Sequence, residues 1–300
     1  MIFSRGQLLK FVVLFAVTVF LPGAANGSSR RVSGELYDPG TSAFANPIDD
    51  PQFLVRQQYL DFLNREPDQA GWEFWMNEIS SCGSDAACIE MKRVNVSAAF
   101  YLSIEFQQTG YLVYRMYKAA YGDLPGAPVP IKFREFIADT QDISRGLVVL
   151  QPGWETMLEN NKQAFAAEFV NRSRFTSVYP ALMTDAEFVD KLNANAGHPL
   201  SQYERDQLEY DLRCGPMTRD KALRAIAEDQ NLYNAEFDRA FVLMQYFGYL
   251  RRNPNEAPDS NFDGYNFWLN KLNTFNGNFA DAEMVKAFIT SIEYRQRFEP

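Results

Sequence analysis

A short acidic segment near residue 260 holds side chains whose types and spacing could bind a metal ion. Three oxygen donors at alternate positions are followed by a glycine: Asp259, Asn261, Asp263 and Gly264. This D-x-N-x-D-G pattern is the first half of an EF-hand loop, where such oxygens surround calcium and the glycine makes a sharp turn. The twelfth position, normally a bidentate glutamate, is Asn270. The segment therefore predicts either a weak calcium site or an acidic turn in which Asp263 caps the next helix.

Carboxylates could also act as a pair in glycoside hydrolysis, in which one acid protonates the leaving group and another attacks or activates water. The candidates are Glu66, Asp68 and Glu105. Glu66 and Asp68 flank Pro67, and residues of this kind beside a turn proline commonly cap the following helix. A capping role is therefore the competing interpretation for these two acids.

Other catalytic sets are not indicated. The single histidine, His198, precedes a proline, and no acid or nucleophile pattern surrounds it. A histidine-based triad or zinc site would have to use this residue. No glycine-rich phosphate loop and no G-x-S-x-G pattern occurs in the chain. The sequence thus favours a protein that is not an enzyme.

The cysteines favour an oxidising compartment. Cys82 and Cys88 lie six positions apart in a loop containing Gly and Ser. A disulfide between them would stabilise the fold by roughly 2 kcal/mol. Metal binding is the alternative, but two cysteines without a nearby histidine make a poor zinc set. Cys214 is left over, either buried or a free thiol.

The first residues have the pattern of an export signal. Arg5 and Lys10 precede the apolar run 11–21, and small residues follow Pro22. This pattern predicts a cleaved signal peptide at 1–25 and a secreted, periplasmic or cell-surface protein. Cleavage would remove two positive charges and change the net charge from -9 to -11. An acidic chain without a basic stripe excludes nucleic acid as a favoured partner, and no second apolar run predicts a membrane span.

The rest of the chain shows helical periodicity, beginning at the helix start Asp50–Pro51. Residues 146–151 (GLVVLQ) are the main candidate for a short strand. Two segments are similar to each other: 59–79 matches the region from 246 to 272, and AFYLSIEF (99–106) matches AFITSIEY (287–294). The corresponding residues are Arg65 and Arg252, Pro67 and Pro254, Gly71 and Gly264, Phe74 and Phe267, and Trp75 and Trp268. Looser copies lie between them.

The repeat also aligns charged and aromatic residues. Glu105 and Glu293 occupy the same place, so we expect the pairs Arg65–Glu105 and Arg252–Glu293 to tie the first helix of each unit to its third. Trp75 and Trp268, at helical spacing, are expected in the core. Trp72 and its counterpart Tyr265 are the better candidates for a surface contact.

The pattern Y-x-x-[FY]-L-x-R-x-P, then G-x-x-F-W, then a helix ending in S-x-E-[FY], resembles the bacterial domain-of-unknown-function family numbered 4214. The match is specific over 53–106 and 238–298. The resemblance implies a helical fold and an exported or cell-surface context, and it carries no catalytic residues. It also extends distantly to the helical linker domain of phycobilisomes, whose role is structural.

The sequence therefore predicts an all-α protein of about four imperfect helical units packed in series after a cleaved signal peptide. The predicted segments are a signal peptide (1–25), a flexible lead-in (26–50) and four helical units (51–110, 111–180, 181–236 and 237–300). The favoured function is a non-catalytic exported module that contacts protein or glycan of the cell envelope or extracellular matrix. The alternatives are an extracellular polysaccharide hydrolase with paired carboxylates and a calcium-stabilised surface module.

Overall fold

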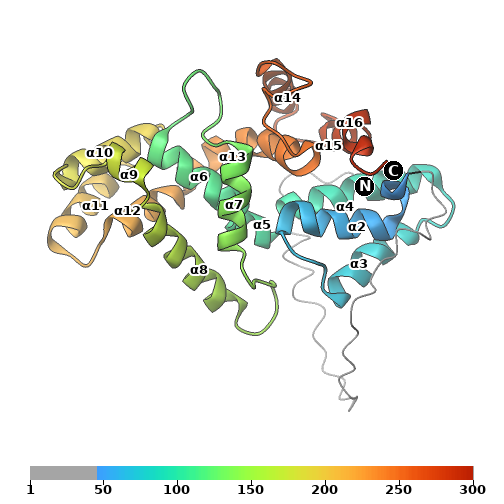
Figure 1. Cartoon of the computed structure of the whole chain (residues 1–300), viewed down its shortest axis with the longest axis horizontal. Coiled ribbons are helices and arrows are strands. Elements are labelled where there is room, and N and C mark those ends of the chain that lie inside the picture. Colours follow the sequence, from blue (N-terminus) through green and yellow to red (C-terminus); the bar gives the residue numbers. More distant parts are fainter. Residues whose placement is uncertain (1–45, 300) are drawn as a thin grey trace, which may run out of the picture. The chain divides into compact units, whose positions relative to one another are not determined.

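The computed structural model describes residues 46–299 (Figure 1). The predicted signal peptide and most of the predicted lead-in lie outside the described residues. Within 46–299 the regular secondary structure is entirely helical, which confirms the all-α prediction. None of these helices is long and apolar enough to cross a membrane.

The expected strand at 146–151 is wrong, because this segment forms consecutive turns. Its backbone donors are used locally: the Leu147 N–H donates to Ser144 and the Gln151 N–H donates to Val148. Gly146 adopts a φ of 70° and Leu150 a φ of 75°, values that no extended strand allows. Only Leu147 is buried, so the apolar run supplies one anchor rather than a strand face.

The described chain packs as two compact units. Unit 1 contains residues up to Ile104 together with 275–299, and unit 2 contains 105–274. The division into four sequence units stays a prediction about repeats, since packing groups the chain differently.

Unit 1 is built around α4. Its elements are η2 (Pro47–Asp49), α2 (Pro51–Gln58), the π-helical turn η3 (Tyr59–Leu63), α3 (Gln69–Ser80), α4 (Ala86–Leu102), α15 (Met284–Ile289) and α16 (Ile292–Gln296). The predicted start of α2 is confirmed: the Asp50 carboxylate accepts from the Gln52 N–H, and Pro51 occupies the first helical position. Helices α2, α3 and α15 all contact α4, so both sequence-distant parts share one core.

The two ends of unit 1 are joined by charged contacts. The Asn46 amide donates to the Arg295 carbonyl at 3.1 Å, and both Arg295 terminal nitrogens reach Asp49 oxygens at 2.7 Å. Arg297 binds the buried Asp61 in the same two-pronged way at 2.9 Å. The hydrogen bonds from Arg295 hold the pKa of Asp49 below its usual range. Residues almost 250 positions apart thus form one edge of the unit.

Unit 2 is built around α6 (Gly110–Tyr121), in which every residue from Gly110 to Ala120 is buried. Helices α7, α10, α12 and α13 pack against it. The other elements are α5 (Ile104–Gln108), α7 (Phe133–Ile143), α8 (Trp154–Phe169), α9 (Ser173–Val178), α10 (Asp185–Asn195), α11 (Gln202–Cys214), α12 (Arg219–Ala227), α13 (Gln230–Gln245), the π-helical turn η4 (Tyr246–Leu250) and α14 (Asp263–Thr274).

Candidate functional site

The two outer repeats build the same helix ending. In each, an α-helix runs into a π-helical turn, η3 or η4, and stops at a residue in the left-handed conformation. That residue is Asn64, with a φ of 54°, in unit 1 and Arg251, with a φ of 57°, in unit 2. The matching backbone shows that the self-similarity read from the sequence is structural.

The arginine of the R-x-P motif follows this ending directly. The Arg65 guanidinium lies 4.9 Å from the Tyr59 ring centre, and its Nη1 is 3.4 Å from an Asp68 oxygen. In the second copy, Arg252 lies 5.5 Å from the Tyr246 ring centre and 2.8 Å from an Asp259 oxygen. The motif therefore folds the turn back over a buried tyrosine through a cation–π contact and an ion pair.

A glycine after each turn lets that tyrosine approach the next helix. A Cβ added at Gly71 would lie 2.2 Å from the Tyr59 hydroxyl, and one at Gly264 would lie 2.7 Å from the Tyr246 hydroxyl. Both separations are shorter than non-bonded atoms allow. The repeated glycine is thus required for close packing.

The acids proposed as a catalytic pair are engaged in structural contacts. Glu66 receives two hydrogen bonds from Arg56, at 2.8 and 2.5 Å. Asp68 caps α3 by accepting from the Gly71 N–H at 2.9 Å, and it also pairs with Arg65. The capping interpretation is the one that the geometry of Asp68 supports.

Several carboxyl groups in the described chain have a pKa below the ordinary value for their residue type. The groups are Asp49, Glu159, Glu187, Asp190, Glu204 and Glu256. Hydrogen bonds from arginine, threonine, serine or asparagine are the leading cause in each case. A general acid at neutral pH needs a raised pKa. These six groups are therefore suited to ion pairing and helix capping.

The two predicted ion pairs each join residues of different units. Arg65 belongs to unit 1 and Glu105 to unit 2, while Arg252 belongs to unit 2 and Glu293 to unit 1. Glu105 is 3% exposed, as the prediction of a buried or half-buried pair requires. Both pairs stay predictions.

The segment proposed for calcium is a hydrogen-bonded turn before α14. Asp259 accepts from Arg252 at 2.8 Å, which compensates its charge. The Asn261 side-chain amide donates to an Asp263 carboxylate oxygen at 2.9 Å, and the Asp263 backbone N–H donates back to the side-chain oxygen Oδ1 of Asn261 at 2.9 Å. Within 46–299, no group of three or more His, Cys, Asp or Glu residues is arranged to hold a metal ion. Calcium binding here stays a prediction.

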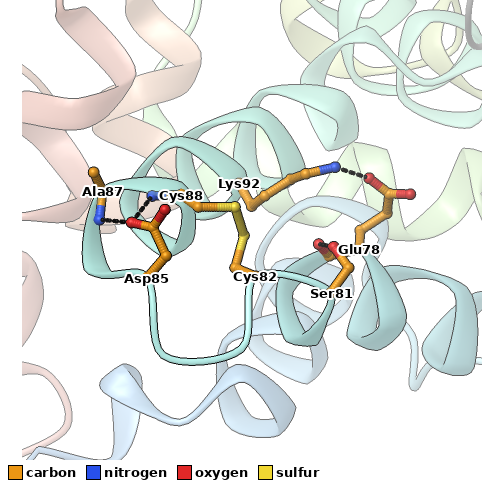
Figure 2. Close-up of a disulfide and its surroundings, with 7 residues drawn as sticks. All are labelled: Glu78, Ser81, Cys82, Asp85, Ala87, Cys88 and Lys92. Atoms are coloured by element: carbon orange, nitrogen blue, oxygen red, sulfur yellow. Dashed lines mark hydrogen bonds and ion pairs between the residues drawn. A yellow bond between two sulfur atoms is a disulfide. The ribbon is translucent and has the colours of Figure 1, made fainter.

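The disulfide prediction is confirmed. Cys82 and Cys88 are bonded across the connection between α3 and α4, with their Cα atoms 5.6 Å apart (Figure 2). Asp85 in the same loop accepts from the Ala87 and Cys88 N–H groups and so caps α4. Lys92 of α4 reaches Glu78 of α3 at 2.6 Å. The loop is thus held covalently and electrostatically, while Cys214 is an exposed thiol on α11.

The aromatic expectations need correction. Tyr265 is fully buried and its hydroxyl donates to the Arg239 carbonyl at 3.0 Å, so it offers no surface contact. Trp72 is half-buried. Trp75 and Trp268, expected in the core, are also only half-buried. A helix near the surface buries one side of an indole and leaves the other side exposed.

A buried charge network in unit 2 was not predicted. Lys118 of α6 lies 2.9 Å from Asp123 and 3.6 Å from Glu236. Arg239 lies 2.7 Å from Asp123 and 3.2 Å from Glu236. The Tyr114 hydroxyl donates to Glu236 at 2.7 Å, and burial raises its pKa well above the ordinary value. Two cations and two carboxylates compensate each other, which is what a buried group of charges requires.

Unit 2 also contains a hollow of about 480 Å³ between α6, α7 and the start of α9, lined by charged and aromatic side chains, which we call the arginine hollow. Its lining includes Tyr117, Tyr121, Arg134, Glu135, Asp139, Arg172, Ser173 and Arg174. These residues lie on or beside three helices and are up to 57 positions apart in the sequence. No local sequence pattern therefore indicates that they form one site.

The comparison with protein families found a match for one part of the chain. Residues 41–109 match the family described as Domain of unknown function (DUF4214). This segment is a DUF4214 domain. Neither the comparison with curated proteins nor the comparison with solved structures found a match.

The DUF4214 segment includes the R-x-P turn, the disulfide and the helices α2 to α5. Its last helix, α5, belongs to unit 2 from Glu105 onward, and the equivalent α16 belongs to unit 1. The matched segment 41–109 therefore has helices in both packing units.

Proposed function

We propose that the protein is a non-catalytic, exported interaction module that contacts glycan or protein of the cell envelope or extracellular matrix. The observation that carries this proposal is the state of the candidate acids. Glu66 is bound by Arg56, and Asp68 caps α3 and pairs with Arg65. Acids committed to such contacts stabilise a scaffold and are poorly placed for proton transfer.

Two features support export. The Cys82–Cys88 disulfide is typical of proteins in oxidising compartments. The pattern of residues 1–25 is that of a signal peptide. The net charge of -9 disfavours polyanionic partners such as nucleic acid, because phosphates would be repelled.

Retention on cell fractions tests the proposal. The purified mature protein would be incubated with envelope and exopolysaccharide fractions of its source, with calcium or with chelator, beside a reduced and denatured sample of the same chain. We expect the folded protein to be retained and the denatured control to be released, with no new reducing ends in the polysaccharide. Release of reducing ends that Asp68→Asn abolishes would contradict the non-catalytic assignment, and so would the absence of retention in both conditions.

A further inference from the structure

The arginine hollow has a rigid floor. Both terminal nitrogens of Arg172 bind Asp139, at 2.8 and 2.9 Å, and Nη1 also lies 3.2 Å from the Tyr117 hydroxyl. Asp139 is 5% exposed and Tyr117 is 3% exposed. Burial raises the pKa of Tyr117, and that of Tyr121 to about 12, so both phenols stay protonated at neutral pH.

Two arginines at the rim keep donors for a ligand. The Arg134 side chain is exposed and makes no hydrogen bond or salt bridge within the described chain. Its nearest charged influence is on Glu256, whose pKa is lowered by hydrogen bonds from Asn253 and, to a smaller extent, by the Arg134 charge. Arg174 lies 3.9 Å from the Tyr121 ring centre and donates one bond to Glu135, at 3.0 Å. A guanidinium has five N–H donors. Stacking and one hydrogen bond therefore orient the Arg174 fork while most of its donors remain unused.

The charges of the hollow match one anionic group. Arg172 is compensated by Asp139 and by Glu168, whose oxygen lies 2.7 Å from it, and Arg174 pairs with Glu135. Arg134 is the lining arginine without a hydrogen-bonded carboxylate in the described chain. The carboxylates beside the arginines, and the acidic chain as a whole, would repel a dense polyanion. A ligand with one carboxylate and several hydroxyls has the complementary chemistry.

We propose that the arginine hollow binds a carboxylate-bearing sugar, a uronic acid residue of a polysaccharide. This inference rests on the proposed function and names the ligand class for it. Planar guanidinium groups pair with carboxylates in a two-pronged geometry, which Arg134 and Arg174 can supply. The Ser173 hydroxyl and the Glu135 carboxylate suit sugar hydroxyls. A volume of about 480 Å³ lies within the range of small-molecule sites.

The test measures binding of an oligosaccharide with a single terminal glucuronate to the full mature protein by calorimetry, with the neutral oligosaccharide of equal length that ends in glucose as the comparison ligand. Arg134→Gln and Arg174→Gln remove the two rim cations. Arg145→Gln is the matched control, because Arg145 is 78% exposed in its side chain and lies outside the hollow. Each rim variant should weaken binding of the glucuronate-terminated oligosaccharide roughly tenfold, since a charge-assisted hydrogen bond is worth at least one factor of ten. The control should bind as the wild type does.

Arg134→Gln keeps the test decisive if Arg174→Gln fails to fold, because Arg134 has no hydrogen bond or salt bridge to lose. Equal weakening by Arg145→Gln, equal binding of the neutral oligosaccharide, or full competition by inorganic phosphate at equal concentration would each overturn the assignment. If the rim variants are retained on the envelope fraction as well as the wild type, the hollow is not the contact while the proposed function stands. Loss of retention for the wild type would remove the proposed function itself.

Discussion

Replacing Gly71 with alanine tests the close approach between the R-x-P turn and α3. The added methyl would lie 2.2 Å from the Tyr59 hydroxyl, 3.1 Å from one Asp68 oxygen and 3.3 Å from the other. Tyr59 is 4% exposed and packs edge-on against Phe100, with ring centres 4.9 Å apart. The tyrosine therefore cannot move without disturbing the core beside α4.

The expected cost follows from two opposing effects. Forcing an extra methyl into a packed site costs about 1–3 kcal/mol in the free energy of unfolding. Alanine is a better helix former than glycine by up to about 1 kcal/mol. We therefore expect Gly71→Ala to lower the free energy of unfolding by about 1–2 kcal/mol. Gly264→Ala should cost less, because its methyl meets the Tyr246 hydroxyl at the longer distance of 2.7 Å.

Urea unfolding followed by circular dichroism gives these free energies. The sharper measurement is a double-mutant cycle with Tyr59→Phe, which removes the clashing oxygen. In the phenylalanine background Gly71→Ala should be less destabilising, giving a coupling of about 1 kcal/mol. A Gly71→Ala variant as stable as the wild type, or a coupling of zero, would refute the reasoning.

Three further predictions concern pH, the disulfide and a strained residue. Hydrogen bonds from Arg224 lower the pKa of Glu159 to about 2. The stabilising effect of the ionised carboxylate is complete above the ordinary pKa of 4.5 and is lost as the pH falls toward 2. Urea titrations at several pH values should therefore show that the free energy of unfolding falls less steeply with acid in Glu159→Gln than in the wild type. Changing Cys82 and Cys88 together to serine should lower the free energy of unfolding by about 2 kcal/mol, and reductant should then have no further effect on stability. Leu150→Gly should raise the free energy of unfolding by about 1 kcal/mol, because leucine at a φ of 75° is strained and the residue, 53% exposed, loses little packing. An unchanged melting temperature would argue against strain there.

Features set by neighbouring residues could be predicted from the sequence. The start of α2 follows from Asp50 and Pro51, and the disulfide follows from two cysteines six positions apart in an exported pattern. The equivalence of Arg65 and Arg252 was visible because each repeat keeps its proline, glycine and aromatic residues at matching positions. Local chemistry determines these features.

Contacts between distant segments could not be predicted. Arg295 meets Asp49 across 246 positions, and no periodicity signals that α15 and α16 complete unit 1. Lys118 is 8% exposed beside Asp123 and Glu236, and no sequence pattern signals that burial. The arginine hollow was missed for the same reason, since its lining comes from three helices. The strand expectation failed at 146–151 because turn-forming glycine dominated over the β propensity of two valines.

The charged contacts that join the two ends of unit 1 have a mechanical consequence. A tensile force applied to the chain on either side of 46–299 would first load the contacts of Asn46 and Asp49 with Arg295. Unit 2 lies between the two segments of unit 1 in the chain, so its helices would bear no load until these bonds, the Arg297–Asp61 pair and the packing of α15 on α4 had all been lost. If the protein is held between a cell and its surroundings, it would then unfold in steps under force. Unit 1 would open in the first step, and the arginine hollow in unit 2 would bear no force during that step.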